Sequence, residues 1–293
     1  PINNVIQLEE GEKVSAILAV REFPEDQYVF FATAQGMVKK VQLSAFKNVR
    51  SQGIKAIALK EGDYLVGAAQ TSGSDDIMLF SNLGKAIRFN EYWEKSGNDE
   101  AEDADIETEI LDDLEDETAD NENALPSGKH GVRPSGRGSG GLRGMRLPAD
   151  GKIVSLITFA PEAAQSDLQV LTATANGYGK RTPIADYSRK NKGGQGNIAI
   201  NTGERNGDLV AATLVGETDD LMLITSGGVL IRTKVEQIRE TGRAAAGVRL
   251  INLDEGEQLV SLERVAEEPE DESVSGEENT GETNVTTEDN TPQ

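Results

Sequence analysis

Basic side chains recur at a fixed spacing along this 293-residue chain. Four glycines that each follow an apolar run are themselves followed, four residues later, by a lysine or an arginine. The glycines are Gly36, Gly84, Gly177 and Gly228, and the bases are Lys40, Arg88, Arg181 and Arg232. Bases at one point of every repeat would form a positive track suited to duplex DNA, which carries a charge every ~1.7 Å of axis. The alternative is that they are ordinary solvated bases of outer strands.

More bases lie in loops that are rich in small residues. The segments "FKNVRSQG", "YSRKNKGGQG" and "IRETGRAAAG" each end at a second glycine of the repeat, as does the basic stretch before Gly141. Small residues let backbone N–H groups approach phosphates, while Lys and Arg supply charge. Because aromatic residues do not alternate with these bases, we expect sequence-tolerant contact with the duplex backbone rather than stacking on single strands. The predicted DNA-contacting residues are Lys39, Lys40, Lys47, Arg50, Arg88, Arg137, Arg143, Lys180, Arg181, Arg189, Lys190, Lys192, Arg232, Lys234 and Arg243.

Residues that could catalyse a reaction or bind a metal are scarce. The chain has no cysteine, which excludes disulfides and thiolate metal sites. Its single histidine, His130, lies beside a glycine and is predicted to be a solvated loop residue. The stretch "GRGSGG" (136–141) matches G-x-G-x-x-G in letters only, because no strand precedes it and no helix pattern follows. We therefore predict no catalytic residue, no metal site and no cofactor in this chain.

The formal net charge of -22 comes from two acidic blocks. Residues 96–125 hold fourteen Asp and Glu and residues 266–293 hold ten, without a lysine or arginine in either block. Outside them, 27 acidic residues face 29 basic ones, so the body of the chain is about neutral. Such blocks bury too little apolar surface to offset ordering entropy, and both are predicted to be disordered. A short acidic amphipathic helix through Ile106, Ile110 and Leu114 is the alternative for the first block.

The elements that must position the bases repeat with a period near 50. The stretches "YVFFATAQGMVKKVQL", "DIMLFSNLGKAIRF", "LQVLTATANGYGKRT" and "DLMLITSGGVLIRT" each join two apolar strands through a glycine turn. Each repeat closes with a polar turn and another strand, as in "NGDLVAATLV". Helical spacing of apolar residues is absent from these segments. The pattern predicts an all-β fold of propeller-like, four-stranded blades.

The domain boundaries follow from the repeats. Blades are predicted over 1–265, with an acidic insert at about 96–135 and an acidic tail over 266–293. The stretch "VIQLEEGEKVSAILAV" (5–20) closely matches "LINLDEGEQLVSLERV" (250–265), so the chain opens with the end of a repeat. We therefore expect a fragment whose first blade is missing.

The stretch "RKNKGGQG" (189–196) resembles a diverged form of the box Q-[R/K]-R-G-G-[R/K]-G of the DNA gyrase A subunit. The resemblance covers nearly all of 1–265, including "TATANGYGKRT", and is to the C-terminal β-pinwheel of that protein. It implies a domain that wraps duplex DNA around a basic rim and supports ATP-dependent negative supercoiling. The chain departs from the family by lacking the first Gln of the box and the breakage-reunion region with its nucleophilic tyrosine. The resemblance therefore implies a part of a topoisomerase without catalytic residues of its own.

The resemblance also implies partners and a location. These are duplex DNA, the gyrase B subunit and a second copy of the gyrase A subunit, in the bacterial cytoplasm at the nucleoid, while ATP and Mg²⁺ would bind elsewhere in the whole enzyme. No signal peptide or membrane span is visible. Two alternatives stay open, namely the C-terminal domain of the topoisomerase IV A subunit, and a propeller-type interaction scaffold without a nucleic-acid role. The scaffold would place apolar or aromatic clusters on the loops.

Overall fold

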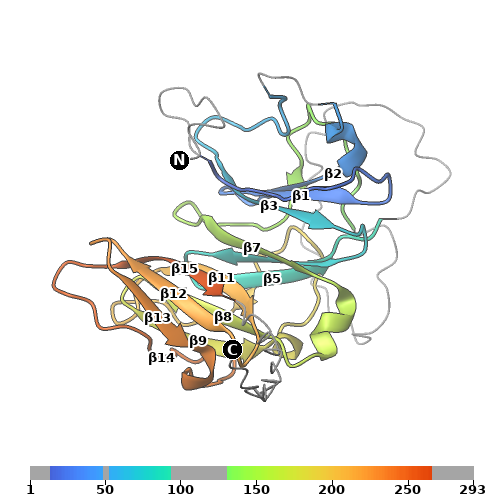
Figure 1. The fold of residues 1–293 in the computed structure, drawn as a ribbon. Helices are drawn as coiled ribbons and strands as arrows, with labels where there is room; N and C mark the ends of the chain where they lie inside the picture. The colour runs from blue at the N-terminus through green and yellow to red at the C-terminus, as the bar shows by residue number, and fades with distance from the viewer. Residues whose placement is uncertain (1–13, 49–52, 94–130, 266–293) are drawn as a thin grey trace, which may run out of the picture.

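The computed structural model of the chain describes residues 14–48, 53–93 and 131–265. The predicted strand–glycine–strand units are present as four β-hairpins that follow one another through the molecule (Figure 1). They are β1 (Tyr28–Thr33) with β2 (Met37–Gln42), β4 (Asp76–Ser81) with β5 (Lys85–Asn90), β8 (Gln169–Thr174) with β9 (Tyr178–Pro183), and β12 (Asp220–Thr225) with β13 (Leu230–Lys234). The predicted all-β fold is confirmed.

Each hairpin is completed by a return strand that pairs antiparallel with its first strand. The return strands are β3 (Leu65–Thr71), β7 (Ile153–Phe159), β11 (Leu209–Val215) and β15 (Leu259–Val265). They are also the strands through which neighbouring sheets meet, since β7 lies between β3 and β11, and β11 lies beside β15. Short 3-10 helices occur at η2 (Leu43–Phe46), η3 (Pro161–Gln165), η4 (Ile184–Asp186) and η5 (Val235–Gln237).

The outermost strand of each complete sheet comes from the following repeat. Strand β6 (Leu142–Arg143) of the second repeat pairs with β2, β10 (Asn197–Ile198) of the third pairs with β5, and β14 (Val248–Arg249) of the fourth pairs with β9. We call these three the borrowed strands. The resulting sheet orders are β3-β1-β2-β6, β10-β5-β4-β7 and β11-β8-β9-β14.

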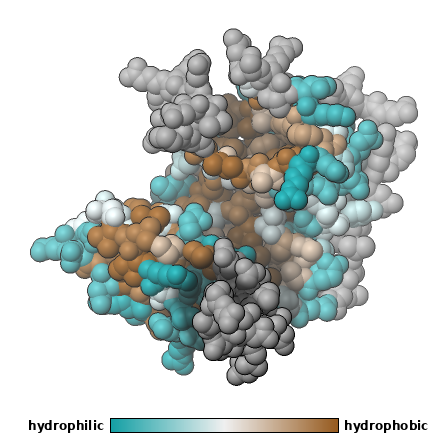
Figure 2. Space-filling model, viewed as in Figure 1, coloured by the Kyte–Doolittle hydropathy of each residue, from teal (hydrophilic) through white to brown (hydrophobic). Residues whose placement is uncertain are grey.

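The last sheet differs from the others because β13 has no outer partner among the described residues. Its order is β13-β12-β15. Val229, Leu230 and Ile231 are therefore 46%, 55% and 37% exposed, and apolar residues gather on the visible face over this hairpin (Figure 2). These apolar residues lie on a strand and its turn, whereas the loops carry bases and glycines.

The core is layered between successive sheets. In β4, Ile77 and Leu79 belong to one cluster with Phe30 of the first sheet, whereas Met78 belongs to another with Val170 of the third. Successive strand residues point to opposite faces. A strand that is covered by a sheet on each side is therefore apolar at nearly every position, and β4 is buried throughout. Each large side chain buried in this way contributes ~1.5–3 kcal/mol.

The second glycine of the second, third and fourth repeats directly precedes a borrowed strand. Gly141, Gly196 and Gly247 have φ values of 88°, 72° and 81°, in the left-handed region that favours glycine. A Cβ atom at Gly141 would lie 2.4 Å from the carbonyl oxygen of Val38 in the preceding repeat, and Gly196 and Gly247 are as tightly placed. These glycines let the chain approach the neighbouring sheet closely enough to pair with it.

The predicted acidic insert and tail lie largely or wholly outside the described residues, which omit 94–130 and 266–293. The flanks of the insert nevertheless meet. The Val132 N–H donates to the Glu91 carbonyl at 3.0 Å. Gly131 is buried so closely against Tyr92 that an added Cβ would lie 1.5 Å from the Tyr92 carbonyl oxygen.

Deleting 96–125 should leave the blades folded. Because the flanks already touch, 93–95 and 126–130 are long enough to join them, and shortening a loop changes its closure entropy by only ~0.6 kcal/mol per halving. We expect a melting temperature within roughly 4 °C of the full chain and an unchanged β-sheet circular dichroism spectrum. A drop of the melting temperature well beyond this value would mean that the segment packs against the blades.

Candidate nucleic-acid interface

The expectation that the four repeated bases form an exposed track is wrong for three of them. Lys40 and Arg88 are only 2% and 7% exposed, and Arg181 only 12%. Their side chains donate to backbone carbonyls of the following repeat. Lys40 Nζ bonds Glu91 O at 2.8 Å, Arg88 Nη1 bonds Tyr187 O at 2.9 Å, and Arg181 Nε bonds Ile238 O at 2.5 Å. These bases therefore connect repeats instead of facing a ligand.

Arg232 is the exception, for a structural reason. The backbone of each buried base is bridged in parallel by the next repeat, in the pairs Lys40 with Pro134, Arg88 with Arg189 and Arg181 with Glu240. No described repeat follows the fourth one, and the Arg232 side chain is 67% exposed. Among the described residues, it bonds Asp220 of its own hairpin.

Two of the predicted bases share one buried carboxylate. Asp76 is fully buried, and its Oδ2 accepts from Arg88 Nη2 at 2.6 Å and from Arg189 Nε at 3.0 Å. Asn90 Nδ2 also donates to this carboxylate, at 2.9 Å. Arg189, in the stretch that resembles the family's box, is thus held in an interior ion pair.

A second buried pair joins the first two repeats. Lys40 Nζ lies 3.6 Å from Glu91 Oε2, and Glu91 is fully buried. Burial lowers the pKa of Lys40 and raises the pKa of Glu91, each opposed by the charge of the other. The Glu91 carboxylate also accepts from the Thr71 hydroxyl and the Gly73 N–H, so its oxygens are not left unpaired.

Lys39 and Lys180 are buried as well, at 1% and 0% exposure. Lys39 Nζ donates to the carbonyls of Ala56, Arg137 and Ser139 at 2.6–3.0 Å. Burial, followed by the charges of Arg137 and Lys55, lowers the pKa of Lys39 to about 8. These lysines cannot reach a phosphate in this conformation.

The remaining predicted residues face solvent, except one that lies outside the described ranges. Lys47, Arg143, Lys190 and Lys234 are exposed, Arg137, Lys192 and Arg243 are half-buried, and Arg50 falls in the undescribed residues 49–52. Among exposed bases that were not predicted, Arg249 occupies the same place on its borrowed strand as Arg143. The matching triplets "GLR" (141–143) and "GVR" (247–249) are the sequence signal that identifies this position.

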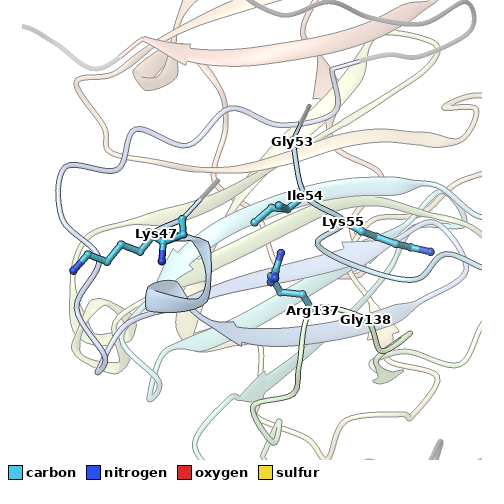
Figure 3. Close-up of a pocket in the computed structure, with 7 residues that line it drawn as sticks. Lys47, Gly53, Ile54, Lys55, Arg137 and Gly138 are labelled. Atoms are coloured by element: carbon cyan, nitrogen blue, oxygen red, sulfur yellow. The ribbon is translucent and has the colours of Figure 1, made fainter. Parts of the chain in front are cut away.

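A hollow between the first and second repeats is lined by several basic residues (Figure 3). Its volume is about 860 Å³, and Lys47, Lys55 and Arg137 line it together with Asn48, Gly53, Ile54 and Gly138. Figure 3 shows Arg137 rising from the loop of the second repeat toward Ile54 on the loop of the first. None of the described residues that line it carries a carboxylate. Three bases and glycine backbone without a counter-charge suit an anion such as a phosphate. We call this hollow the basic pocket.

Within the described residues, no group of His, Cys, Asp or Glu could hold a metal ion. None of the helices there is long and apolar enough to cross a membrane. Four-stranded sheets that exchange their outer strands and present basic loops define a propeller-type domain.

The chain belongs to the DNA gyrase C-terminal domain family, whose fold is described as a beta-propeller. The family match covers residues 27–72, 75–92, 130–160, 169–215 and 219–266. The chain is 95% identical over 268 residues to the DNA gyrase A subunit of Neisseria gonorrhoeae, covering 92% of this chain and 29% of the relative. It is 46% identical over 283 residues to that of Aeromonas salmonicida, covering 93% and 30%. The chain thus spans under a third of the length of these relatives.

Solved structures support the same fold. The DNA gyrase A C-terminal domain superposes with a TM-score of 0.67 at 22% identity, covering 90% of this chain and 74% of that one. The C-terminal domain of DNA topoisomerase IV superposes with a TM-score of 0.71 at 21% identity, covering 90% and 69%. The topoisomerase IV alternative therefore shares the fold, whereas the family match is to gyrase.

Proposed function

We propose that this chain binds duplex DNA through the basic loops and borrowed strands at the outer ends of its sheets, and bends the duplex along the array. In the longer gyrase A protein, this binding would serve ATP-dependent negative supercoiling together with the gyrase B protein and a second gyrase A protein, in the bacterial cytoplasm at the nucleoid. The observation that carries the proposal is the basic pocket, which Lys47, Lys55 and Arg137 line with no carboxylate among the described lining residues. Membership of the gyrase family supports it.

Contacts spread over several repeats are what bending requires. Bending 20–30 base pairs by 40–90° costs of order 1–6 kcal/mol, which one phosphate contact cannot offset. The chain offers successive contact points, since Arg143 and Arg249 sit on borrowed strands of different repeats. A duplex that touches consecutive outer edges follows the curvature of the array. The contacts are to charge and shape, so we expect little dependence on base sequence.

Replacing Lys47, Lys55 and Arg137 together with alanine tests the proposal. Binding of a mixed-sequence duplex should weaken by at least tenfold at moderate salt, and the slope of log K against log salt should fall by about 0.9 for each phosphate that is no longer neutralised. Gel-shift titrations at several salt concentrations measure both quantities.

The matched control replaces Arg21, Lys60 and Lys152, three exposed bases outside the pocket, with alanine. It removes the same charge and should change affinity far less. Equal losses in the two variants, or a binding constant that does not respond to salt, would contradict a defined phosphate site. Closing nicked plasmid with ligase in the presence of the wild-type chain should shift the linking number if the duplex is wrapped.

A further inference from the structure

Lys39 lies beneath the junction of the two loops that form the basic pocket. Its ammonium has three donors, and all three are used by carbonyls, at 3.0 Å to Ala56, 2.6 Å to Arg137 and 2.8 Å to Ser139. Ala56 directly follows Lys55 in the loop of the first repeat, and Arg137 belongs to the loop of the second. One buried ammonium thus fixes the backbone of both pocket walls to strand β2.

Lys180 repeats this arrangement two repeats later. Its Nζ donates to the carbonyls of Gly242 and Arg243, both at 2.5 Å. In both repeats the carbonyl that is held belongs to an arginine whose side chain is partly exposed, namely Arg137 or Arg243. The second hairpin has Ile87 at the equivalent position, three residues after its turn glycine, so the arrangement is not required by the fold.

We propose, on the basis of the DNA-binding function proposed above, that Lys39 and Lys180 are positioning residues for phosphate recognition. They hold the carbonyls of the loops inward, so that the guanidinium groups of Arg137 and Arg243 and the ammonium of Lys55 are presented to the duplex backbone. Neither lysine touches DNA. The class of ligand is the phosphate of a duplex, and the lysines act through the loops that contact it.

The charges around the two lysines should make DNA affinity depend on pH. The groups that face Lys39 are Arg137 and Lys55, both cationic, and those that face Lys180 are Asp186 and Arg243. Burial is the main cause that lowers the pKa of both lysines to about 8. A phosphate bound at Arg137 or Arg243 adds negative charge nearby and raises these pKa values. The bound state then holds more protons near pH 8–9, and DNA affinity must fall as the pH rises through this window.

The contribution of these lysines to the free energy of unfolding changes with pH in the direction opposite to DNA affinity. The usual lysine pKa is 10.5, so between about pH 8 and 10.5 the unfolded chain binds more protons at these lysines than the folded chain does. Their contribution to the free energy of unfolding therefore rises with pH in this window. Weaker DNA binding at pH 9 cannot be ascribed to unfolding caused by these two groups.

The test compares Lys39→Met, Arg137→Ala and the double variant, with Lys60→Met as a control for the loss of one exposed charge. The dissociation constant of a fluorescently labelled mixed-sequence duplex should rise about tenfold in each of the first two variants. The double variant should be weaker than either by no more than about twofold, because both changes remove the same contact. Lys60→Met should change the constant less than about twofold, because Lys60 is exposed and does not line the basic pocket, so salt screens its charge.

A pH series at constant ionic strength tests the positioning role separately. A lysine with a structural role alone would not change how the dissociation constant depends on pH. The wild-type dissociation constant should rise up to about tenfold from pH 7 to 9, and the Lys39→Met/Lys180→Met variant should show no such rise. If Lys39→Met fails to fold, the wild-type pH series still tests the proposal. A wild-type dissociation constant that does not change from pH 7 to 9 would overturn it. Wild-type binding by Arg137→Ala would refute the phosphate site itself. Weak binding by Arg137→Ala, with normal binding by Lys39→Met and a flat profile, would refute only the positioning role.

Discussion

Replacing Asp76 with asparagine lowers the free energy of unfolding by about 3–5 kcal/mol, because it leaves two buried or nearly buried arginines without their shared counter-charge. Arg88 and Arg189 come from different repeats and both bond the Asp76 carboxylate, which is fully buried. Asparagine keeps the shape of the side chain, so the loss is one of charge. At about 2–4 °C per kcal/mol for a domain of this size, the melting temperature should fall by roughly 6–20 °C in a circular dichroism melt.

The chain supplies its own control in Asp220→Asn. Asp220 occupies the same place on β12 as Asp76 does on β4 and bonds Arg232, the equivalent of Arg88. Because Arg232 is 67% exposed, water replaces the lost ion pair and the cost should stay below about 1 kcal/mol. Similar losses in the two variants would show that burial by the following repeat does not set the strength of this pair.

Replacing the turn residue Gly84 with alanine should also destabilise the chain strongly, by about 2–5 kcal/mol. Its φ of 72° lies in the left-handed region, which costs an alanine roughly 1–2 kcal/mol. In addition, the new Cβ would lie 2.3 Å from the carbonyl oxygen of Ile200, which belongs to the next repeat. Relieving that overlap shifts backbone, at a further cost of about 1–3 kcal/mol. Thermal melts of the variant measure the total.

Gly228→Ala separates the two contributions. Gly228 is the equivalent turn residue of the last hairpin, with φ of 81°, and no described atom lies within 4 Å of its added Cβ. It should therefore show the conformational cost alone, about 1–2 kcal/mol. Equal effects at Gly84 and Gly228 would mean that the neighbouring repeat yields to the extra methyl group at little cost.

Local sequence signals determined what could be predicted of the fold. Each hairpin has an apolar, β-branched or aromatic run beside a glycine turn. This pattern can be recognised in the sequence of one repeat without reference to its neighbours. The borrowed strands are different. Two residues are too few to show a period, and their pairing depends on a sheet built from the preceding repeat. Sequence patterns thus predicted the hairpins, but not the exchange that connects them.

The site was predicted less well for a related reason. The spacing of Lys40, Arg88 and Arg181 correctly indicated that the three bases occupy one place in successive repeats. It carried no information on whether another chain segment covers that place, and here the following repeat does. Among the bases in loops rich in small residues, Lys47 and Lys190 lie at the surface, whereas Arg189 is held in an interior ion pair.

The exchange of strands also gives the array a polarity. A chain cut between the third and fourth repeats loses β14 together with the fourth hairpin, and β9 is then uncovered, as β13 already is among the described residues. Loss of the first repeat removes no strand from any later sheet. Arrays whose repeats contact only their neighbours unfold as linked units. Fraying should therefore begin at the C-terminal hairpin and pass toward the first repeat, since each hairpin that opens withdraws the outer strand protecting the one before it.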